Sequence, residues 1–248
     1  MLTLDPAELS PGPALGARPW GVPAVAAALT LPLLFWALAL GLSGSGETDL
    51  TDGEVAAALI GTIIFDLALI GIAAGVCLWR YRLGWAELGL RPFASDLWWL
   101  PLVAAATAHA SVIVYALVFT AVGADEAAPR QEDLEELFGN RAVLPLAGVA
   151  TVIVAPVAEE IFFRGFVFAG LLRRLGAFGA MAASGLVFGT FHVAGVDTLG
   201  LVIPFTAIGM GFAWLYYRTG SLWPSILTHL VFNLVSFVLL ASLGTDST

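Results

Sequence analysis

The stretch 155-APVAEEIFFRGF-166 places Glu159, Glu160 and Arg164 inside one of the most apolar parts of the chain. A charged side chain at the centre of a bilayer costs at least about 2.5 kcal/mol on insertion scales. Three such groups facing lipid would oppose insertion, so we expect them to face the interior of a helix bundle or a water-filled cavity. Glu160 and Arg164 share a helical face and can form an ion pair. Glu159 is rotated by about 100° from Glu160, which leaves it free for another role.

Composition places the chain among integral membrane proteins. Of its 248 residues, 59% are hydrophobic and 12% are charged, whereas soluble domains carry about a quarter charged residues. The net charge of -9 argues against a nucleic-acid partner, which would require a basic footprint. The single cysteine, Cys77, lies in an apolar run and is interpreted as a packing residue.

Apolar runs of roughly 20 residues are long enough to cross a bilayer. They predict an all-α fold, a polytopic transmembrane helix bundle of about seven spans. The runs are Val22 to Leu42, Val55 to Trp79, Leu97 to Val122, Val143 to Leu172, Ala177 to Val193, Leu199 to Tyr217 and Trp223 to Leu243. An eighth span would arise if the fourth run were broken near Arg164 and Gly165.

These runs predict five regions along the chain. Residues 1–21 are expected to form a disordered N-terminal tail, and residues 22–122 three accessory spans. Residues 123–141 would form an acidic loop with a short amphipathic helix at Glu132 to Gly139. Residues 142–243 would form the core that carries the chemistry, followed by a C-terminal tail at 244–248.

The basic residues, all ten of them arginine, collect mainly on alternate loops. By the positive-inside rule, this distribution places the N-terminus in the cytoplasm. We therefore expect a multi-pass protein of a cell membrane, most simply a prokaryotic plasma membrane, with the lipid bilayer as its surroundings.

Two later spans carry polar side chains at helical spacing. The stretch 188-FGTFH-192 ends in His192, and 229-HLVFN-233 begins with His229 and ends in Asn233. One glutamate and two histidines in a wet pocket could hold and deprotonate a water molecule. Alternatively, Glu159, His192 and His229 could bind zinc, because two histidines and a carboxylate form a catalytic ligand set with an open position. Asn233 could donate a hydrogen bond to a developing oxyanion.

Helix boundaries raise a difficulty for this convergence. At ~1.5 Å per residue, Glu159 and His192 lie about 20 Å from their cytoplasmic helix ends, but His229 lies only about 9 Å from Trp223. The three side chains can meet only if the boundaries differ from those predicted. We expect that the stretch 164-RGFVFAGLLRR-174 partly leaves the membrane core.

Other polar residues in the apolar runs have simpler interpretations. His109 is isolated and is predicted to make an interhelical hydrogen bond. Asp66 interrupts the second run without a surrounding motif, so both a structural and a functional role stay open. Ser184 precedes Gly185 and would be the nucleophile of a rhomboid-like serine protease, but Ala182 replaces the first glycine of that motif. A site-2-type protease is disfavoured because the chain has no HExxH.

The ordered set EEIFFR, FGTFH and HLVFN resembles the CPBP family of intramembrane proteases. This family includes the type II CAAX prenyl endopeptidases and Abi-like relatives linked to bacteriocin processing or immunity. Its pattern of EExxxR, FxxxH and HxxxN occurs here without substitution, over about Pro145 to Leu239. The stretch 87-ELGLRP-92 is also similar to a juxtamembrane segment of bacterial members.

The resemblance implies roles for individual residues. Glu159 would be the general base, His192 would help to hold the attacking water, and His229 and Asn233 would stabilise the oxyanion. Glu160 and Arg164 would be an architectural ion pair, and Phe188 would pack the pocket. The resemblance implies an endopeptidase acting on a peptide or membrane-anchored protein substrate, either prenylated or a peptide precursor. No cofactor is certain, and zinc is open. The alternatives are a scaffold or immunity protein without activity and a proton-coupled transporter.

Overall fold

The computed structural model describes residues 15, 18–42, 51–121, 142–193 and 196–244. Within these ranges, all regular structure is helical, as the apolar runs predict. Six helical segments in the described part of the chain are long and apolar enough to cross a membrane. The amphipathic helix predicted at 132–139, the acidic loop around it, most of the predicted N-terminal tail and residues 245–248 lie outside the described residues.

The first half of the chain supplies three spans. These are α1 (Val22–Leu42), α2 (Asp52–Ala74) continued by the π-helical η3 (Gly75–Arg80), and α3 (Leu100–Ala121), which follows the short η4 (Ser95–Leu97). Thr51 and Glu54 form a capping box that begins α2, satisfying backbone N–H groups that the first turn leaves unpaired. Large apolar side chains such as Leu34, Ile64 and Leu117 are exposed on these helices, as expected of surfaces that face lipid.

The second half contains the longest helical run, from Leu144 to Phe191. It then continues through a short connection to two further helices. The elements are α5 (Leu144–Gly148), η6 (Val149–Val154), α6 (Ala155–Glu159), η7 (Glu160–Phe168), α7 (Ala169–Phe191), η8 (Val196–Leu201), α8 (Val202–Thr219) and α9 (Trp223–Gly244).

A break inside α7 accounts for the difference between six segments and the predicted seven. Gly176 has φ 69° and ψ 176°, a conformation that glycine adopts readily and other residues rarely. The predicted fourth and fifth runs therefore lie on either side of Gly176 in one helical segment. Near Arg164 and Gly165 the helix is continuous, as the π-helix η7, so the eighth span considered for that position does not form.

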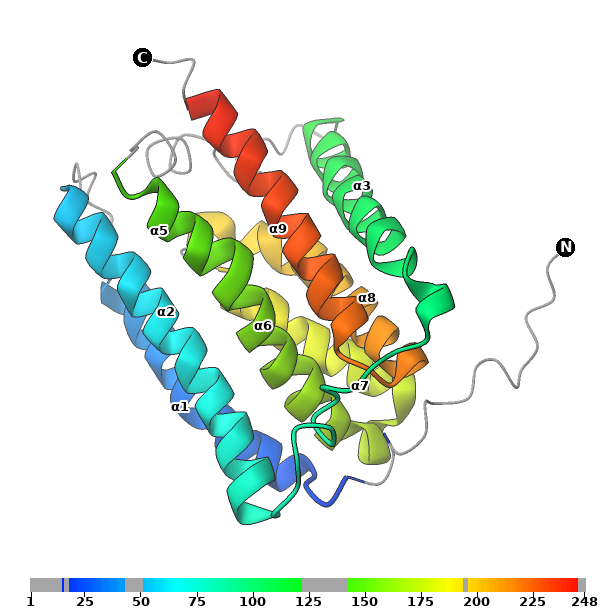
Figure 1. Cartoon of the computed structure of the whole chain (residues 1–248). Coiled ribbons are helices and arrows are strands. Elements are labelled where there is room, and N and C mark those ends of the chain that lie inside the picture. The colour runs from blue at the N-terminus through cyan, green and yellow to red at the C-terminus, as the bar shows by residue number, and fades with distance from the viewer. Residues whose placement is uncertain (1–14, 16–17, 43–50, 122–141, 194–195, 245–248) are drawn as a thin grey trace, which may run out of the picture.

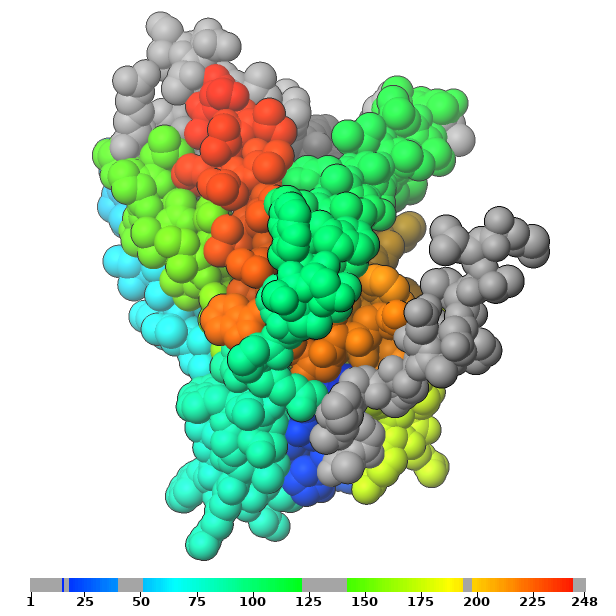
Figure 2. All heavy atoms as spheres, turned by 45° about the vertical axis from the view of Figure 1, so that its right-hand side comes forward, coloured from blue at the N-terminus to red at the C-terminus, as the bar shows by residue number. Residues whose placement is uncertain are grey.

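Figure 1 shows the helices as a bundle in which α9 lies between α6 and α3, with α7 and α8 behind them. The main packing pairs are α7 with α8, α3 with α9, and α2 with α6 and η7. Figure 2 shows α3 lying over α8 and α9 on one face of the molecule. The accessory helices α1 and α2 thus cover one side of the central run, and α3 covers the other.

One end of the bundle is closed by connections that hydrogen-bond to one another. The amide of Leu222 donates to the carbonyl of Gly89, and Arg91 Nε donates to the carbonyl of Gly220 at 2.6 Å. The indole of Trp20 is buried and donates to the carbonyl of Phe166 at 2.9 Å. The last residues of the predicted N-terminal tail are therefore part of the packed structure.

Contacts at this end of the bundle explain how Glu159, His192 and His229 can lie at a similar depth although their distances from the predicted helix ends differ. Gly165 packs against the backbone of Leu88 and the side chain of Leu222, so η7 is already level with the connections at that point. At ~1.5 Å per residue, the break at Gly176 lies about 16 Å further along. The turn before α9 is thus set back from the break at Gly176, as the prediction for residues 164–174 requires.

Candidate active site

The predicted site residues come from three helical segments. Glu159 is the last residue of α6 and Glu160 the first of η7. His192 follows the last residue of α7, and His229 and Asn233 lie one turn apart on α9. The change from α- to π-helix occurs between the two glutamates, and such π-helical turns are frequent at functional sites.

Glu160 and Arg164 form a fully enclosed ion pair. Arg164 Nη1 donates to Glu160 Oε1 at 2.7 Å, and both side chains are 0% exposed. Arg164 Nη2 also donates to the carbonyl of Gly209 on α8 at 3.2 Å. The guanidinium lies between two rings, 4.3 Å from the centroid of Phe188 and 5.0 Å from that of Phe212. The pair therefore joins η7 to α7 and α8.

Glu159 has a different environment from its neighbour. Its side chain is 16% exposed, and its Oε2 lies 3.9 Å from Nε2 of His229. Oε2 is enclosed and has no hydrogen-bond partner. The structure therefore separates the two glutamates as the helical spacing predicts, with one carboxylate paired to arginine and the other directed to a histidine.

His229 lies between the two glutamates. Its Nδ1 is 3.2 Å from Oε1 of Glu160, the oxygen that also accepts from Arg164. Because a carboxylate paired with arginine is an acceptor, Nδ1 donates this hydrogen bond. The imidazole packs against Phe212, with ring centroids 5.0 Å apart. This arrangement fixes the ring and directs Nε2 toward Glu159.

His192 is held by the end of its own helix. Its Nδ1 lies 2.8 Å from the carbonyl of Phe188. A carbonyl only accepts, so Nδ1 carries the proton and Nε2 of the neutral ring is an acceptor. The ring stacks on Phe205, with ring centroids 4.2 Å apart. Both histidines also contact Phe188, at centroid distances of 4.4 and 5.9 Å.

Asn233 lies one turn beyond His229 and contacts the other side of the site. Its Nδ2 donates to the carbonyl of Thr151 in η6 at 2.7 Å. One N–H of the amide is used in this bond, and an amide nitrogen has two. The bond aligns α9 with the helical run that carries Glu159.

The residues described do not present a metal site. No group of three or more His, Cys, Asp and Glu side chains within the described ranges is arranged to hold a metal ion. Nδ1 of both histidines is used in hydrogen bonds to protein oxygens, one of them to Glu160. We therefore route no step of the chemistry through a metal.

The isolated polar residues have structural partners. His109 Nδ1 donates to the carbonyl of Ala105, and its ring packs on Phe232 at 4.4 Å. Ser184 is fully buried and donates to the carbonyl of Phe163 at 2.9 Å. Its hydroxyl is thus engaged by the neighbouring helix, which leaves the rhomboid-like interpretation without support.

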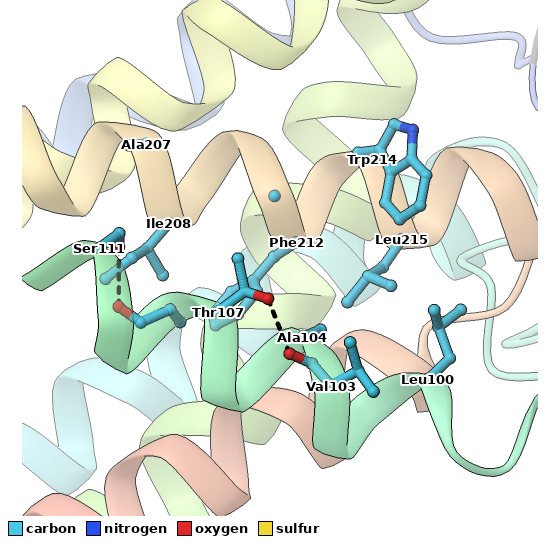
Figure 3. Close-up of a pocket in the computed structure, with 12 residues that line it drawn as sticks. Leu100, Val103, Ala104, Thr107, Ser111, Ala207, Ile208, Phe212, Trp214 and Leu215 are labelled. Carbon is cyan, nitrogen blue, oxygen red and sulfur yellow. Dashed lines mark hydrogen bonds between the residues drawn. The ribbon is translucent and has the colours of Figure 1, made fainter. Parts of the chain in front are cut away.

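A groove of about 310 Å³ lies between α3 and α8. Figure 3 shows Thr107 and Ser111 in its wall, with hydroxyl groups bonded to carbonyls of their own helix, so the lining is predominantly apolar. Phe212 belongs both to this lining and to the aromatic contacts of His229. The groove therefore reaches to within one aromatic ring of the polar site.

Sequence patterns did not identify three of these positions. The carbonyl of Gly209 and the ring of Phe212 complete the enclosure of Arg164, and Thr151 accepts from Asn233. Backbone carbonyls carry no residue-type signal, and a phenylalanine in an apolar helix is indistinguishable from ordinary packing. Only the arrangement of helices in space reveals them.

The fold and this geometry define a polytopic helical membrane protein with an enclosed site of carboxylate, imidazole and amide groups. Residues 141–235 match the family model for the type II CAAX prenyl endopeptidase, Rce1-like. The protein named "Putative membrane peptidase YdiL" of Bacillus subtilis (strain 168) is 37% identical over 100 residues. Over this segment the chain is therefore similar to a type II CAAX prenyl endopeptidase family and to a membrane peptidase, as the three motifs predict.

The similarity is confined to part of each protein. The aligned residues are 40% of this chain and span 38% of the length of the Bacillus subtilis relative. No solved structure matches the chain. The family match contains every predicted site residue and leaves α1, α2 and α3 outside it.

Proposed function

We propose that the protein is an intramembrane endopeptidase in which Glu159 activates water to hydrolyse a peptide bond. The observation that carries this proposal is the position of Glu159 Oε2, enclosed, without a hydrogen-bond partner and 3.9 Å from His229 Nε2. A carboxylate poised in this way can accept a proton from a water molecule in a sheltered site. The match of residues 141–235 to the type II CAAX prenyl endopeptidase model supports the same class of reaction.

In the proposed reaction, Glu159 accepts one proton of the water and Nε2 of His192 accepts a hydrogen bond from the other. The water oxygen attacks the scissile carbonyl, and negative charge develops on the carbonyl oxygen. Asn233 donates a hydrogen bond to that oxygen. Glu159 then returns its proton to the leaving nitrogen, the C–N bond breaks, and a carboxylate and an amine are released.

His229 contributes to the oxyanion only when Nε2 carries a proton. Because its Nδ1 already donates to Glu160, an Nε2–H donor requires the imidazolium form. The carboxylate of Glu160 lies against the ring and favours that positive charge. We infer that Glu160 supports His229 electrostatically in addition to pairing with Arg164.

The substrate in this proposal is a peptide or a membrane-anchored protein. The apolar lining of the groove between α3 and α8 suits a hydrocarbon chain, either a prenyl group or another membrane anchor, rather than a charged segment. The groove lies beside His229, so an anchor seated there would hold the adjoining peptide near Glu159.

The test is a comparison of Glu159→Gln with wild type in the native membrane. We expect uncleaved precursors to accumulate in the variant, and purified Glu159→Gln protein to lose cleavage of any such precursor by at least about 100-fold. Glu87→Gln is the matched control, because Glu87 is partly exposed and caps a turn by accepting from the amide of Gly84. Cleavage that persists in Glu159→Gln would contradict the proposal.

A further inference from the structure

A third carboxylate lies beside this site, outside the segment that matches the family model. Asp66 on α2 is 3% exposed, and its Oδ2 is enclosed without a hydrogen-bond partner. Asp66 makes no hydrogen bond to any residue in the described part of the chain. Asp66 lies close enough to Glu159 that the two carboxylates would repel each other if both were ionised.

The packing of α2 explains this position. The buried residues of α2 are Leu59, Asp66, Leu69 and Ala73, which lie on one helical face. That face packs against α6 and η7, the elements that carry Glu159 and Glu160. The adjacent Phe65 contacts Phe191 at a centroid distance of 6.0 Å, next to His192. Asp66 therefore lies on the face of α2 that packs against the elements carrying Glu159 and Glu160.

A structural role does not account for Asp66. A buried polar group without a partner destabilises the folded state, and does so more strongly when it is charged. Apolar side chains occupy the equivalent positions of this stripe, one and two turns away, without such a cost. An unpaired ionisable group inside a membrane domain is a functional candidate by default.

We propose that Asp66 is a further catalytic residue, whose carboxylate accepts a hydrogen bond from the leaving nitrogen of the scissile peptide bond. This inference rests on the proposed function. The two O–H groups of the attacking water donate to Glu159 and His192. A third acceptor in the site is therefore available to a donor other than the water. The leaving nitrogen is that donor, because it keeps its N–H and gains the proton that Glu159 returns.

The covalent steps are unchanged by this assignment. Glu159 moves the proton from water to nitrogen, and the C–N bond breaks as the carbonyl reforms. Asp66 gains and loses no proton. Its negative charge stabilises the positive charge that develops on nitrogen as the amine departs.

The experiment compares two substrates with one acyl portion, a peptide amide and the matched thioester, on purified full-length protein. A thiolate leaves without protonation, so it offers nothing to Asp66. We expect Asp66→Asn and Asp66→Ala to lower kcat on the amide by about 100-fold, with less than about a threefold change on the thioester and KM unaltered. The melting temperature of Asp66→Asn should equal or exceed that of wild type, because a buried unpaired charge is removed.

Asp96→Asn is the control, because Asp96 is exposed at the start of a short helix, and it should behave as wild type. Equal losses on amide and thioester, or an unchanged rate on the amide, would overturn the role of Asp66. A parallel loss of melting temperature and activity in both Asp66 variants would also overturn it. The proposed function fails separately, if Glu159→Gln retains wild-type rates on both substrates.

Discussion

At the scale of single residues, one carboxylate oxygen organises the site. Oε1 of Glu160 accepts from Arg164 at 2.7 Å and lies 3.2 Å from Nδ1 of His229. All three groups are almost entirely enclosed. Breaking either contact leaves a buried charge uncompensated, which costs far more than an exposed ion pair contributes.

We therefore predict that Arg164→Ala lowers the free energy of unfolding by about 3–5 kcal/mol. The substitution leaves Glu160 without its cation and removes the ring contacts of the guanidinium with Phe188 and Phe212. Thermal unfolding in detergent, followed by circular dichroism, measures the effect. Arg174→Ala is the matched control, because Arg174 is exposed. An Arg164→Ala protein as stable as the control would contradict the structural assignment of the pair.

The spacing of residues along the sequence was sufficient to predict only some of the contacts in the site. The pairing of Glu160 with Arg164 depends on one turn of helix, so the order of residues contains it. The proximity of Glu159 to His229 joins α6 to α9. The polar residues at helical spacing in separate apolar runs made it a hypothesis, to which the resemblance to a family added the roles of the residues. Asp66 belongs to no motif, and its role depends on which face of α2 packs against α6.

At the scale of elements, the close approach of η7 to the connection before α3 sets the depth of the site. A Cβ placed on Gly165 would lie 2.6 Å from the backbone oxygen of Leu88 and 3.2 Å from Leu222 Cδ1. The first of these atoms is backbone and cannot move aside as a side-chain end can. Position 165 thus requires glycine because the backbone of Leu88 approaches it closely, rather than because of the conformational freedom of glycine.

We predict that Gly165→Ala destabilises the protein by about 1–3 kcal/mol, because it overpacks this contact. The control is Gly61→Ala on α2, where an added Cβ meets nothing within 4 Å and alanine favours the helix by about 0.5–1 kcal/mol. Melting temperatures of the two variants, measured side by side in one detergent, should therefore shift in opposite directions. A Gly165→Ala protein with the melting temperature of wild type would contradict this prediction, because it would show that the connection at Leu88 shifts without loss of stability.

The groove between α3 and α8 leads to a prediction on substrate binding. Gly211 lines it, and a Cβ there meets nothing within 4 Å, so Gly211→Phe should fill the groove without disturbing the fold. We expect KM for a lipid-anchored peptide to rise by about tenfold, equivalent to about 1.4 kcal/mol. The rate on the same peptide without its anchor should be unchanged.

Gly71→Phe provides the matched control for this experiment, because Gly71 is exposed on α2 and equally open. It should leave both substrates unaffected. If Gly211→Phe and Gly71→Phe give the same KM on the anchored peptide, the groove does not bind the anchor.

At the scale of the whole molecule, hydropathy was a sufficient guide to class and approximate span number. Apolar runs must be helical in a bilayer, because every backbone group needs an internal partner. The boundaries could not be read in the same way. The position of the turn before α9 relative to the break at Gly176 depends on contacts of Gly165 with Leu88 and Leu222. These contacts join segments distant in the sequence and leave no periodic signal.

The two ends of the bundle differ in charge, which predicts an orientation in the membrane that can be tested. Arg80, Arg91 and Arg173 lie at the end where Leu222 bonds to Gly89 and Gly21 approaches Arg173, whereas α2 begins at the opposite end with Asp52 and Glu54. From the positive-inside rule, we propose that the arginine end faces the cytoplasm. The single cysteine, Cys77, is 0% exposed, so the native chain gives little background in thiol labelling.

We accordingly predict opposite labelling of two single substitutions at exposed positions, Gly53→Cys at the start of α2 and Arg174→Cys near the break in α7. In intact spheroplasts, a membrane-impermeant maleimide should modify Gly53→Cys and spare Arg174→Cys, which should react only after lysis. The wild-type chain should react in neither condition. The reverse pattern would place the arginine end outside the cell, and would require the proposed substrate to approach Glu159 from the extracytoplasmic side.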